Sequence, residues 1–134
     1  MSANERNLKG VLICPDKNTA EEASIPNNQD GYYEALNCDT IDIVERSIGG
    51  QYFDIICDDE ALLKDDPIPA ALDKLHEPML FGRLFVCHHD DEGELTSLSD
   101  DEVKHILSLC ESGTYVNYDN GTSHSIKVLT RVGY

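Results

Sequence analysis

The stretch Thr40–Cys57, TIDIVERSIGGQYFDIIC, predicts two β-strands that fold back on each other, and it decides the fold. The pair Gly49-Gly50 divides it, and a type I′ turn needs a positive φ at both central positions, which glycine adopts readily. β-Branched and aromatic residues fill both arms, as is typical of strands. The hairpin is expected to be scaffold without chemistry of its own. Its facing apolar residues are Ile41, Ile43 and Ile48 on one arm and Tyr52, Phe53, Ile55 and Ile56 on the other.

Apolar runs on either side of the hairpin predict further elements. Gly10–Cys14 indicates a buried strand, and Ala20–Ile25 is expected to return beside it. Tyr32–Leu36 indicates one or two helical turns with Asp30 as the cap. After the hairpin we expect a short helix at Ala70–Leu75, a central strand at Met79–Cys87 with a bulge at Gly82, and a terminal hairpin of Thr114–Tyr118 with Ser125–Val132.

The best-specified helix is Asp100–Glu111. Ser99 is its predicted N-cap, and Glu102 stands three residues later, which is the spacing of a capping box. Apolar residues at i, i+3, i+4 and i+7 form one face that is expected to pack on the sheet. These residues are Val103, Ile106, Leu107 and Cys110.

Together the elements predict an α+β fold: a mainly antiparallel sheet around the central β-hairpin, with one well-capped helix packed on a face. The length of 134 residues fits a single domain. Residues 1–8 are expected to form a flexible arm, residues 9–112 the core, and residues 113–134 C-terminal strands or a tail.

The charge of the chain is strongly negative. It has 10 Lys and Arg residues and 26 Asp and Glu residues, for a net charge of −16, and residues 58–112 alone carry −11. Such a charge repels nucleic acid and anionic membranes and attracts basic partners. The chain also has no basic patch to displace counterions from phosphates. We therefore expect a basic protein partner and no direct binding to nucleic acid or to a membrane.

The cysteines and the lack of long apolar stretches predict a cytoplasmic protein. An odd number of cysteines without a CxxC pair fits buried thiols in a reducing compartment better than a disulfide framework. The first ten residues contain no apolar leader, and no stretch approaches the roughly 20 apolar residues of a membrane span. The cysteines are Cys14, Cys38, Cys57, Cys87 and Cys110.

Asp-Asp-Glu occurs three times, at residues 58–60, 90–92 and 100–102. The last triplet opens the predicted helix, where acids complement the macrodipole. The first two follow predicted strands, where turns need polar residues. An EF-hand loop requires a Gly at position 6 and a Glu at position 12, and the sequence from Asp90 lacks that pattern. Turns and caps explain the triplets best, a shared acidic surface is the alternative, and no metal site is predicted.

Histidine and cysteine suggest two further kinds of site, and neither is predicted. His88, His89 and Cys87 offer zinc ligands, but adjacent strand residues point to opposite faces and no second ligand pair follows. A Cys-His nucleophile at Cys57 or Cys87 would need a nearby cation or helix N-terminus to form a thiolate, and the net charge opposes this. Phosphate-loop, dinucleotide-binding, nucleophile-elbow and HExxH patterns are absent. We therefore predict no enzymatic activity and no cofactor.

Several segments match a known pattern in order and spacing: Val11–Pro15, Tyr32–Leu36, Thr40–Cys57, Asp58-Asp59-Glu60 with Leu62, Pro67–Leu72, Leu80–Cys87, and Asp91-Glu92-Gly93 through Thr96–Ser99. In these pieces the chain resembles an uncharacterised domain family of bacteriophages and integrative conjugative elements of Gram-positive bacteria. The resemblance covers residues 9–110. Ala61 replaces a common glycine, and Ala70 replaces a frequent asparagine. The resemblance implies a genetic setting and no reaction.

The predicted function is that of a non-enzymatic acidic accessory protein of a mobile genetic element. It is expected to bind a basic host or element protein, in the sharpest form by mimicking the charge of nucleic acid. One alternative is a small-ligand binding module with a pocket between the Tyr32-Tyr33 helix and a sheet edge. Another is an acidic domain with no electrostatic partner, and the sequence assigns no oligomeric state. The predicted binding surface consists of Asp58, Asp59, Glu60, Asp65, Asp66, Asp90, Asp91, Glu92 and Glu94.

Overall fold

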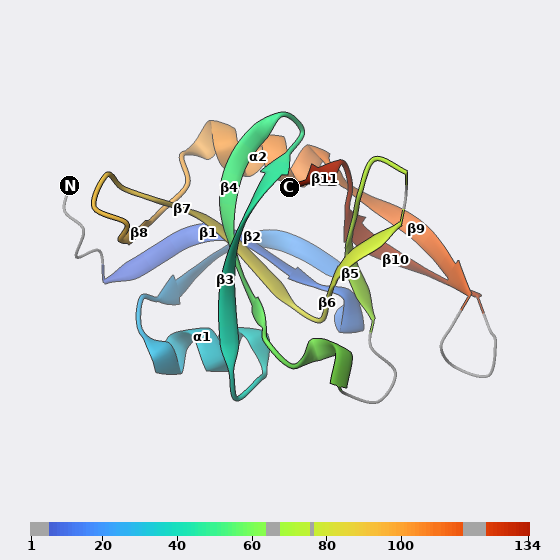
Figure 1. The fold of residues 1–134 in the computed structure, drawn as a ribbon, viewed down its shortest axis with the longest axis horizontal. Coiled ribbons are helices and arrows are strands. Elements are labelled where there is room, and N and C mark those ends of the chain that lie inside the picture. Colours follow the sequence, from blue (N-terminus) through green and yellow to red (C-terminus); the bar gives the residue numbers. More distant parts are fainter. Residues whose placement is uncertain (1–5, 64–67, 76, 117–122) are drawn as a thin grey trace.

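A computed structural model of the chain describes residues 6–63, 68–75, 77–116 and 123–134. Within these ranges the fold is mostly β, with eleven strands in two sheets and two α-helices (Figure 1). The predicted α+β class with one packed helix is therefore wrong, because most segments outside the hairpin also pair as strands. The strands are β1 (Asn7–Cys14), β2 (Thr19–Pro26), β3 (Ile41–Ile48), β4 (Gln51–Asp58), β5 (Pro69–Leu72), β6 (Pro78–Phe81), β7 (Leu84–His89), β8 (Leu95–Thr96), β9 (Cys110–Val116), β10 (Ser123–Leu129) and β11 (Val132–Gly133). The helices are α1 (Gln29–Leu36) and α2 (Asp100–Ser108), and two short 3-10 helices are η1 (Pro15–Lys17) and η2 (Ala61–Leu63).

The central hairpin is confirmed. β3 pairs with β4 in antiparallel register along the whole of both strands. Gly49 (φ 60°) and Gly50 (φ 94°) occupy the two turn positions, and both lie in the left-handed region that a type I′ turn requires. The hairpin forms part of the first sheet, whose strand order is β11-β3-β4-β7-β1-β2, with β8 beside β7. β4 therefore lies near the middle of this sheet.

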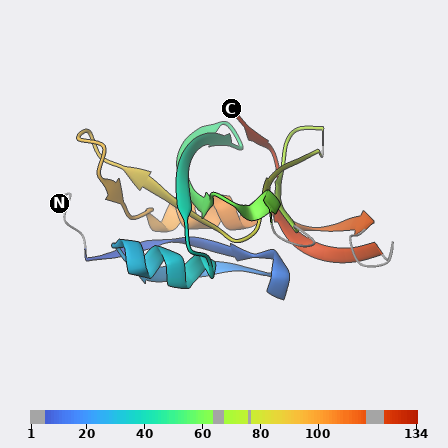
Figure 2. The same cartoon turned by 60° about the horizontal axis from the view of Figure 1, so that its bottom comes forward.

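The central strands β4 and β7 of the first sheet are buried on both faces over most of their length. On one face, α2 and the second sheet cover residues such as Val11 and Ile55. On the other face, α1 covers residues such as Phe85 and Ile56, so that the two α-helices lie on opposite sides of β1 (Figure 2). Ile55 and Ile56 are neighbours on β4 and both are fully buried. A strand buried on both faces has a continuous apolar run instead of an alternating pattern, as the sequence of β4 shows.

The second sheet has the strand order β6-β5-β10-β9, and two predictions are corrected there. The helix predicted at Ala70–Leu75 is wrong, because residues 69–72 form β5, which is buried throughout and pairs in parallel with β10. Met79–Cys87 is not one strand with a bulge. Gly82 has φ 79° and separates β6 in the second sheet from β7 in the first. A left-handed glycine thus marks the point where the chain leaves one sheet for the other.

The two α-helices begin at side-chain caps. The predicted capping box of α2 is confirmed: Glu102 N donates to Ser99 Oγ (3.1 Å), and Ser99 N donates to Glu102 Oε1 (2.8 Å). α2 ends earlier than predicted because Cys110 already begins β9. α1 is capped by Asn28 rather than by Asp30, and Asn28 Oδ1 accepts from Gly31 N (2.8 Å). Across the described ranges, neither helix combines the length and the apolar character that a membrane crossing requires.

The predicted terminal hairpin is confirmed in the pairing of β9 with β10, while the residues that connect them lie outside the described ranges. The second strand ends at Leu129 instead of Val132, because Arg131 has φ 61° and redirects the chain. β11 then pairs with β3 at the edge of the first sheet. Gly49 N donates to Arg131 O (3.2 Å), so the β10–β11 connection is tied to the turn of the central hairpin.

Candidate functional site

The first predicted group of acids, Asp58, Asp59 and Glu60, forms the connection between β4 and η2. Glu60 N donates to Asp58 Oδ1 (2.9 Å), and Thr40 Oγ1 donates to Glu60 Oε1 (3.5 Å). Asp59 and Glu60 are exposed. These residues therefore build a turn, as turn-forming acids commonly do, and also present two exposed charges. The predicted site residues Asp65 and Asp66 lie outside the described residues.

The second group forms the turn between β7 and β8. Asp90 Oδ1 accepts hydrogen bonds from Glu92 N (2.9 Å) and Glu94 N (3.0 Å), which fixes the turn. The side chains of Asp91, Glu92 and Glu94 are exposed. Among the residues that the structure describes, none of these three carboxylates forms an ion pair. The turn therefore presents three carboxylates that no described cation neutralises.

The two groups lie at opposite ends of β7 (Figure 1). β4 and β7 are antiparallel, with Cys57 opposite Leu84, so Asp58 lies beside the start of β7. Asp90 follows the last residue of β7. Six residues of strand at about 3.3 Å each separate the groups by roughly 20 Å. The structure thus forms two acidic surfaces, an η2 surface (Asp58–Glu60) and a β7–β8 surface (Asp90–Glu94).

The third triplet, at the start of α2, is used within the fold. Asp100 Oδ1 lies 2.5 Å from Lys9 Nζ, and this hydrogen bond lowers the pKa of Asp100. Glu102 Oε2 lies 2.5 Å from His88 Nε2, in addition to its role in the capping box. The interpretation of this triplet as a helix start is confirmed.

The two adjacent histidines point to opposite faces of the first sheet, as predicted. His88 contacts Glu102 of α2, and its ring stacks on Phe53 with the ring centroids 4.8 Å apart. On the other face, His89 Nδ1 lies 2.6 Å from Asp54 Oδ2. The hydrogen bond to Asp54 raises the pKa of His89. The two imidazoles therefore belong to two different environments.

A cluster of two carboxylates and one imidazole on β3, β4 and β7 was not predicted. Glu45 and Asp54 are directly opposite each other in the hairpin, and their carboxylates and the His89 imidazole offer ligand atoms within 4.8 Å of one another. Asp54 is 7% exposed, whereas Glu45 and His89 are exposed. The sequence did hold a signal: Glu45 stands four residues before Gly49, and Asp54 four residues after Gly50. A turn at this glycine pair places them face to face.

The cysteines that were considered as nucleophiles are held as thiols. Burial raises the pKa of Cys57 to about 11 and the pKa of Cys87 to about 12. Burial also raises the pKa of Cys110 to about 12. A nucleophilic cysteine needs a lowered pKa, so these three side chains lack the activation that thiol chemistry requires.

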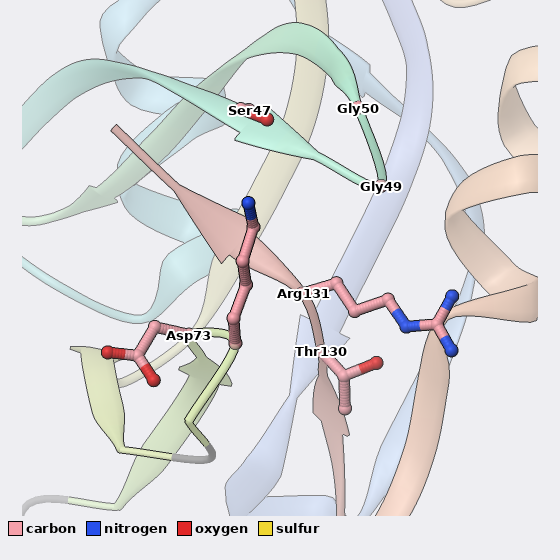
Figure 3. Close-up of a pocket in the computed structure, with 7 residues that line it drawn as sticks. Ser47, Gly49, Gly50, Asp73, Thr130 and Arg131 are labelled. Carbon is pink, nitrogen blue, oxygen red and sulfur yellow. The ribbon is translucent and has the colours of Figure 1, made fainter.

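The tyrosines of α1 pack into the fold. Tyr32 and Tyr33 contact the buried cluster that includes Leu36 and Phe85, and the Tyr32 hydroxyl donates to Asn27 Oδ1. A cavity of about 460 Å³ lies elsewhere, beside the turn of the central hairpin (Figure 3). The structure thus offers a different location for a small ligand than the predicted one.

Three segments distant in sequence form this hairpin-turn cavity, which explains why no motif revealed it. Asp73 Oδ1 accepts from Leu75 N (2.8 Å), so its carboxylate stabilises the β5–β6 connection. Thr130 Oγ1 donates to Leu109 O (2.9 Å). In Figure 3 the guanidinium group of Arg131 points away from Asp73. The lining residues are Ser47, Gly49, Gly50, Asp73, Lys74, Thr130 and Arg131, of which Lys74 and Arg131 are basic.

Comparison with known proteins identifies the family. No curated protein and no solved structure matches the chain. A family model described as a domain of unknown function (DUF3846) matches residues 8–111, from β1 into β9, and so includes the hairpin, both α-helices and both acidic surfaces. The resemblance to an uncharacterised domain family is thereby confirmed, whereas the match carries no statement about phages or conjugative elements. The chain belongs to the DUF3846 family, a domain family of unknown function.

Proposed function

We propose that this protein is a non-enzymatic accessory protein of a phage or integrative conjugative element that acts in the cytoplasm by binding a basic protein. The observation that carries the binding proposal is the β7–β8 surface. There Asp91, Glu92 and Glu94 are exposed and form no ion pair with any described residue. The net charge of −16 adds a field that steers a basic partner toward the protein.

The β7–β8 turn holds its charges in a fixed arrangement. Asp90 binds two backbone amides of the turn, and Asp90 N donates to Glu94 O (2.9 Å). A pre-organised turn loses less conformational entropy on binding than a disordered acidic tail does. The three exposed carboxylates can therefore contribute to affinity without first ordering the backbone that bears them.

The η2 surface extends the proposal to mimicry of nucleic acid. It lies roughly 20 Å from the β7–β8 surface, by the length of β7. In the sharper form of the proposal, both surfaces take the place of phosphate groups, and one basic groove contacts both. Variants of one surface at a time distinguish this form from binding through the β7–β8 surface alone.

The proposal excludes catalysis by thiol chemistry on physical grounds. The pKa values of Cys57 and Cys87 are raised by burial, which is opposite to the change that activates a cysteine. His88 and His89 are each engaged with a carboxylate on a different face of the sheet.

Affinity capture from cell lysate at about 0.1 M and about 0.5 M salt tests the proposal, because salt screens the interaction between exposed charges. The full chain is compared with a variant carrying Asp91→Asn, Glu92→Gln and Glu94→Gln. A matched control removes three exposed charges elsewhere, on β2 and α1, and consists of Glu21→Gln, Glu22→Gln and Glu34→Gln.

The expected result is a basic protein that is captured at low salt, is lost at high salt, and binds the β7–β8 variant more weakly than the control variant. Equal weakening by both variants would show that only the total charge matters. Capture that persists at high salt, or no captured protein, would contradict the proposal and favour an acidic domain without an electrostatic partner.

A second candidate function is the binding of a small ligand. The hairpin-turn cavity favours it, because this cavity combines a volume of about 460 Å³ with the basic residues Lys74 and Arg131. Ligand pockets commonly have volumes of about 300–1,000 Å³. A thermal-shift screen of metabolites and nucleotides tests this candidate, and a flat response across a broad panel would remove it.

A further inference from the structure

We propose that Glu45, Asp54 and His89 bind a divalent transition-metal cation on the β3–β4–β7 surface. This cation site goes beyond the proposed binding of a basic protein and does not depend on it. The three residues come from three neighbouring strands of the first sheet. Their side chains lie on the face opposite to the one that α2 covers.

The pairing of the strands brings the three ligands together. Glu45 and Asp54 are direct partners in the β3–β4 register, and Asp54 is also the partner of Cys87 on β7. His89 follows Cys87 by two residues and therefore points to the same face. Its Nδ1 lies 2.6 Å from Asp54 Oδ2, and the ligand atoms of all three residues lie within 4.8 Å of one another.

The charges of this cluster favour a cation. Like charges directly opposite each other on paired strands destabilise a sheet. Glu45 and Asp54 form such a pair, and Asp54 is 7% exposed, so water solvates its carboxylate poorly. Among the described residues, the two carboxylates have one ion-pair partner, His89, which contacts Asp54. Asp90 adds a further negative charge near the imidazole. A divalent cation would balance both carboxylates at once.

The ligand set indicates which cation fits. Imidazole nitrogen with two carboxylates suits Zn²⁺ and related transition metals, whereas Ca²⁺ and Mg²⁺ prefer oxygen ligands alone. Ligand atoms around a tetrahedral zinc ion lie about 3.4 Å apart, given metal–ligand distances of about 2.1 Å. His89 Nδ1 and Asp54 Oδ2, which are 2.6 Å apart, would separate to this spacing as the ion replaces the proton between them. The exposed side chains of Glu45 and His89 can make the adjustment while buried Asp54 stays in place. Three protein ligands leave further coordination positions for water.

Isothermal titration of the full chain with Zn²⁺, and separately with Mn²⁺, Mg²⁺ and Ca²⁺, tests the site. His89→Ala and Glu45→Gln each remove one exposed ligand, and Glu45→Gln keeps the size and exposure of the side chain. The matched control is His88→Ala, which removes the neighbouring imidazole on the opposite face. Co²⁺ serves as a spectroscopic probe, because thiolate ligands give intense charge-transfer absorption and nitrogen and oxygen ligands do not.

We expect one Zn²⁺ per chain, with affinity reduced about tenfold or more by His89→Ala and by Glu45→Gln, and unchanged by His88→Ala. We expect no binding of Mg²⁺ or Ca²⁺ at comparable concentrations, and a Co²⁺ spectrum without charge-transfer bands. The proposal is overturned if Zn²⁺ does not bind, or if both ligand variants bind it like the unmodified chain. A Co²⁺ thiolate spectrum, or loss of binding with His88→Ala alone, would also overturn it by placing the ion elsewhere.

Discussion

The burial of β4 on both faces gives a sharp prediction for two adjacent residues. Ile55 and Ile56 are each 0% exposed, yet they belong to different clusters. Ile55 packs in the cluster beneath α2, and Ile56 packs in the cluster beneath α1. We therefore expect Ile55→Ala and Ile56→Ala to destabilise the protein by similar amounts. In a sheet with one solvated face, only one of the two substitutions would be costly.

The magnitude follows from the groups removed. Each substitution deletes three carbon atoms, which is about 2.4 kcal/mol at about 0.8 kcal/mol per buried methylene. The cavity left behind adds to this value, so each variant should lose about 2–5 kcal/mol of the free energy of unfolding. Ile43→Ala is the control, because Ile43 is on the same hairpin and 43% exposed. Because little more than half of its side chain is buried, the same arithmetic gives a loss of about 1.4 kcal/mol, without a cavity contribution.

Urea denaturation followed by circular dichroism measures these differences in the free energy of unfolding. The comparison requires the same m-value, the slope of that free energy against urea concentration, in all variants. A typical domain has about 5–15 kcal/mol of stability, so each single variant should still fold. A loss below about 1 kcal/mol for either single variant would refute the two-sided burial of β4.

Two further predictions concern titratable groups. Asp16 accepts hydrogen bonds from Arg83 at 2.9 and 3.1 Å, and this contact lowers the pKa of Asp16 below its ordinary value of 3.8. Asp16→Asn should therefore lower the free energy of unfolding at pH 7, and the difference should vanish as the pH falls through the lowered pKa; a difference independent of pH would contradict this. Cys57, Cys87 and Cys110 should resist iodoacetamide at pH 8 in the native protein and react in urea, because burial keeps them protonated. Mass spectrometry counts the labelled thiols, and rapid native labelling of these three would show that they are accessible thiolates.

Elements that depend on local chemistry were predicted well. Gly49-Gly50 requires a turn whatever the rest of the chain does, and the eight paired residues on each side follow from it. The Ser99–Glu102 capping box likewise needs only residues within one helical turn. In both cases the interactions that decide the structure join residues close in sequence.

Elements that depend on distant partners were not predicted. β5 is a strand because it pairs with β6 and, at Leu129, with β10. Its four buried residues have no alternation, and a short apolar run of this kind fits a buried strand or a helix equally. The apolar residues on both sides of Gly82 favour a bulge within a single strand. Only the existence of a second sheet makes it the break between two strands.

The candidate sites show the same limit in another form. The sequence predicted correctly that the first two acidic triplets lie in turns. The predicted binding surface combines the two triplets. The pairing of β4 with β7 instead places them at opposite ends of β7. The hairpin-turn cavity depends likewise on the position of Arg131, whose segment pairs with β3 from the far end of the sequence.

The register of the central hairpin links its role as scaffold to the proposed cation site. Side chains alternate between the faces of a sheet, so a slip of one residue would move every side chain of β3 to the other face. Ile48 and Val44 contact the cluster beneath α2, and this burial opposes such a slip. Glu45, between them, is thereby held on the opposite face and directly across from Asp54. The apolar residues that build the core therefore also determine that two carboxylates meet beside His89, although none of these apolar residues contacts a cation.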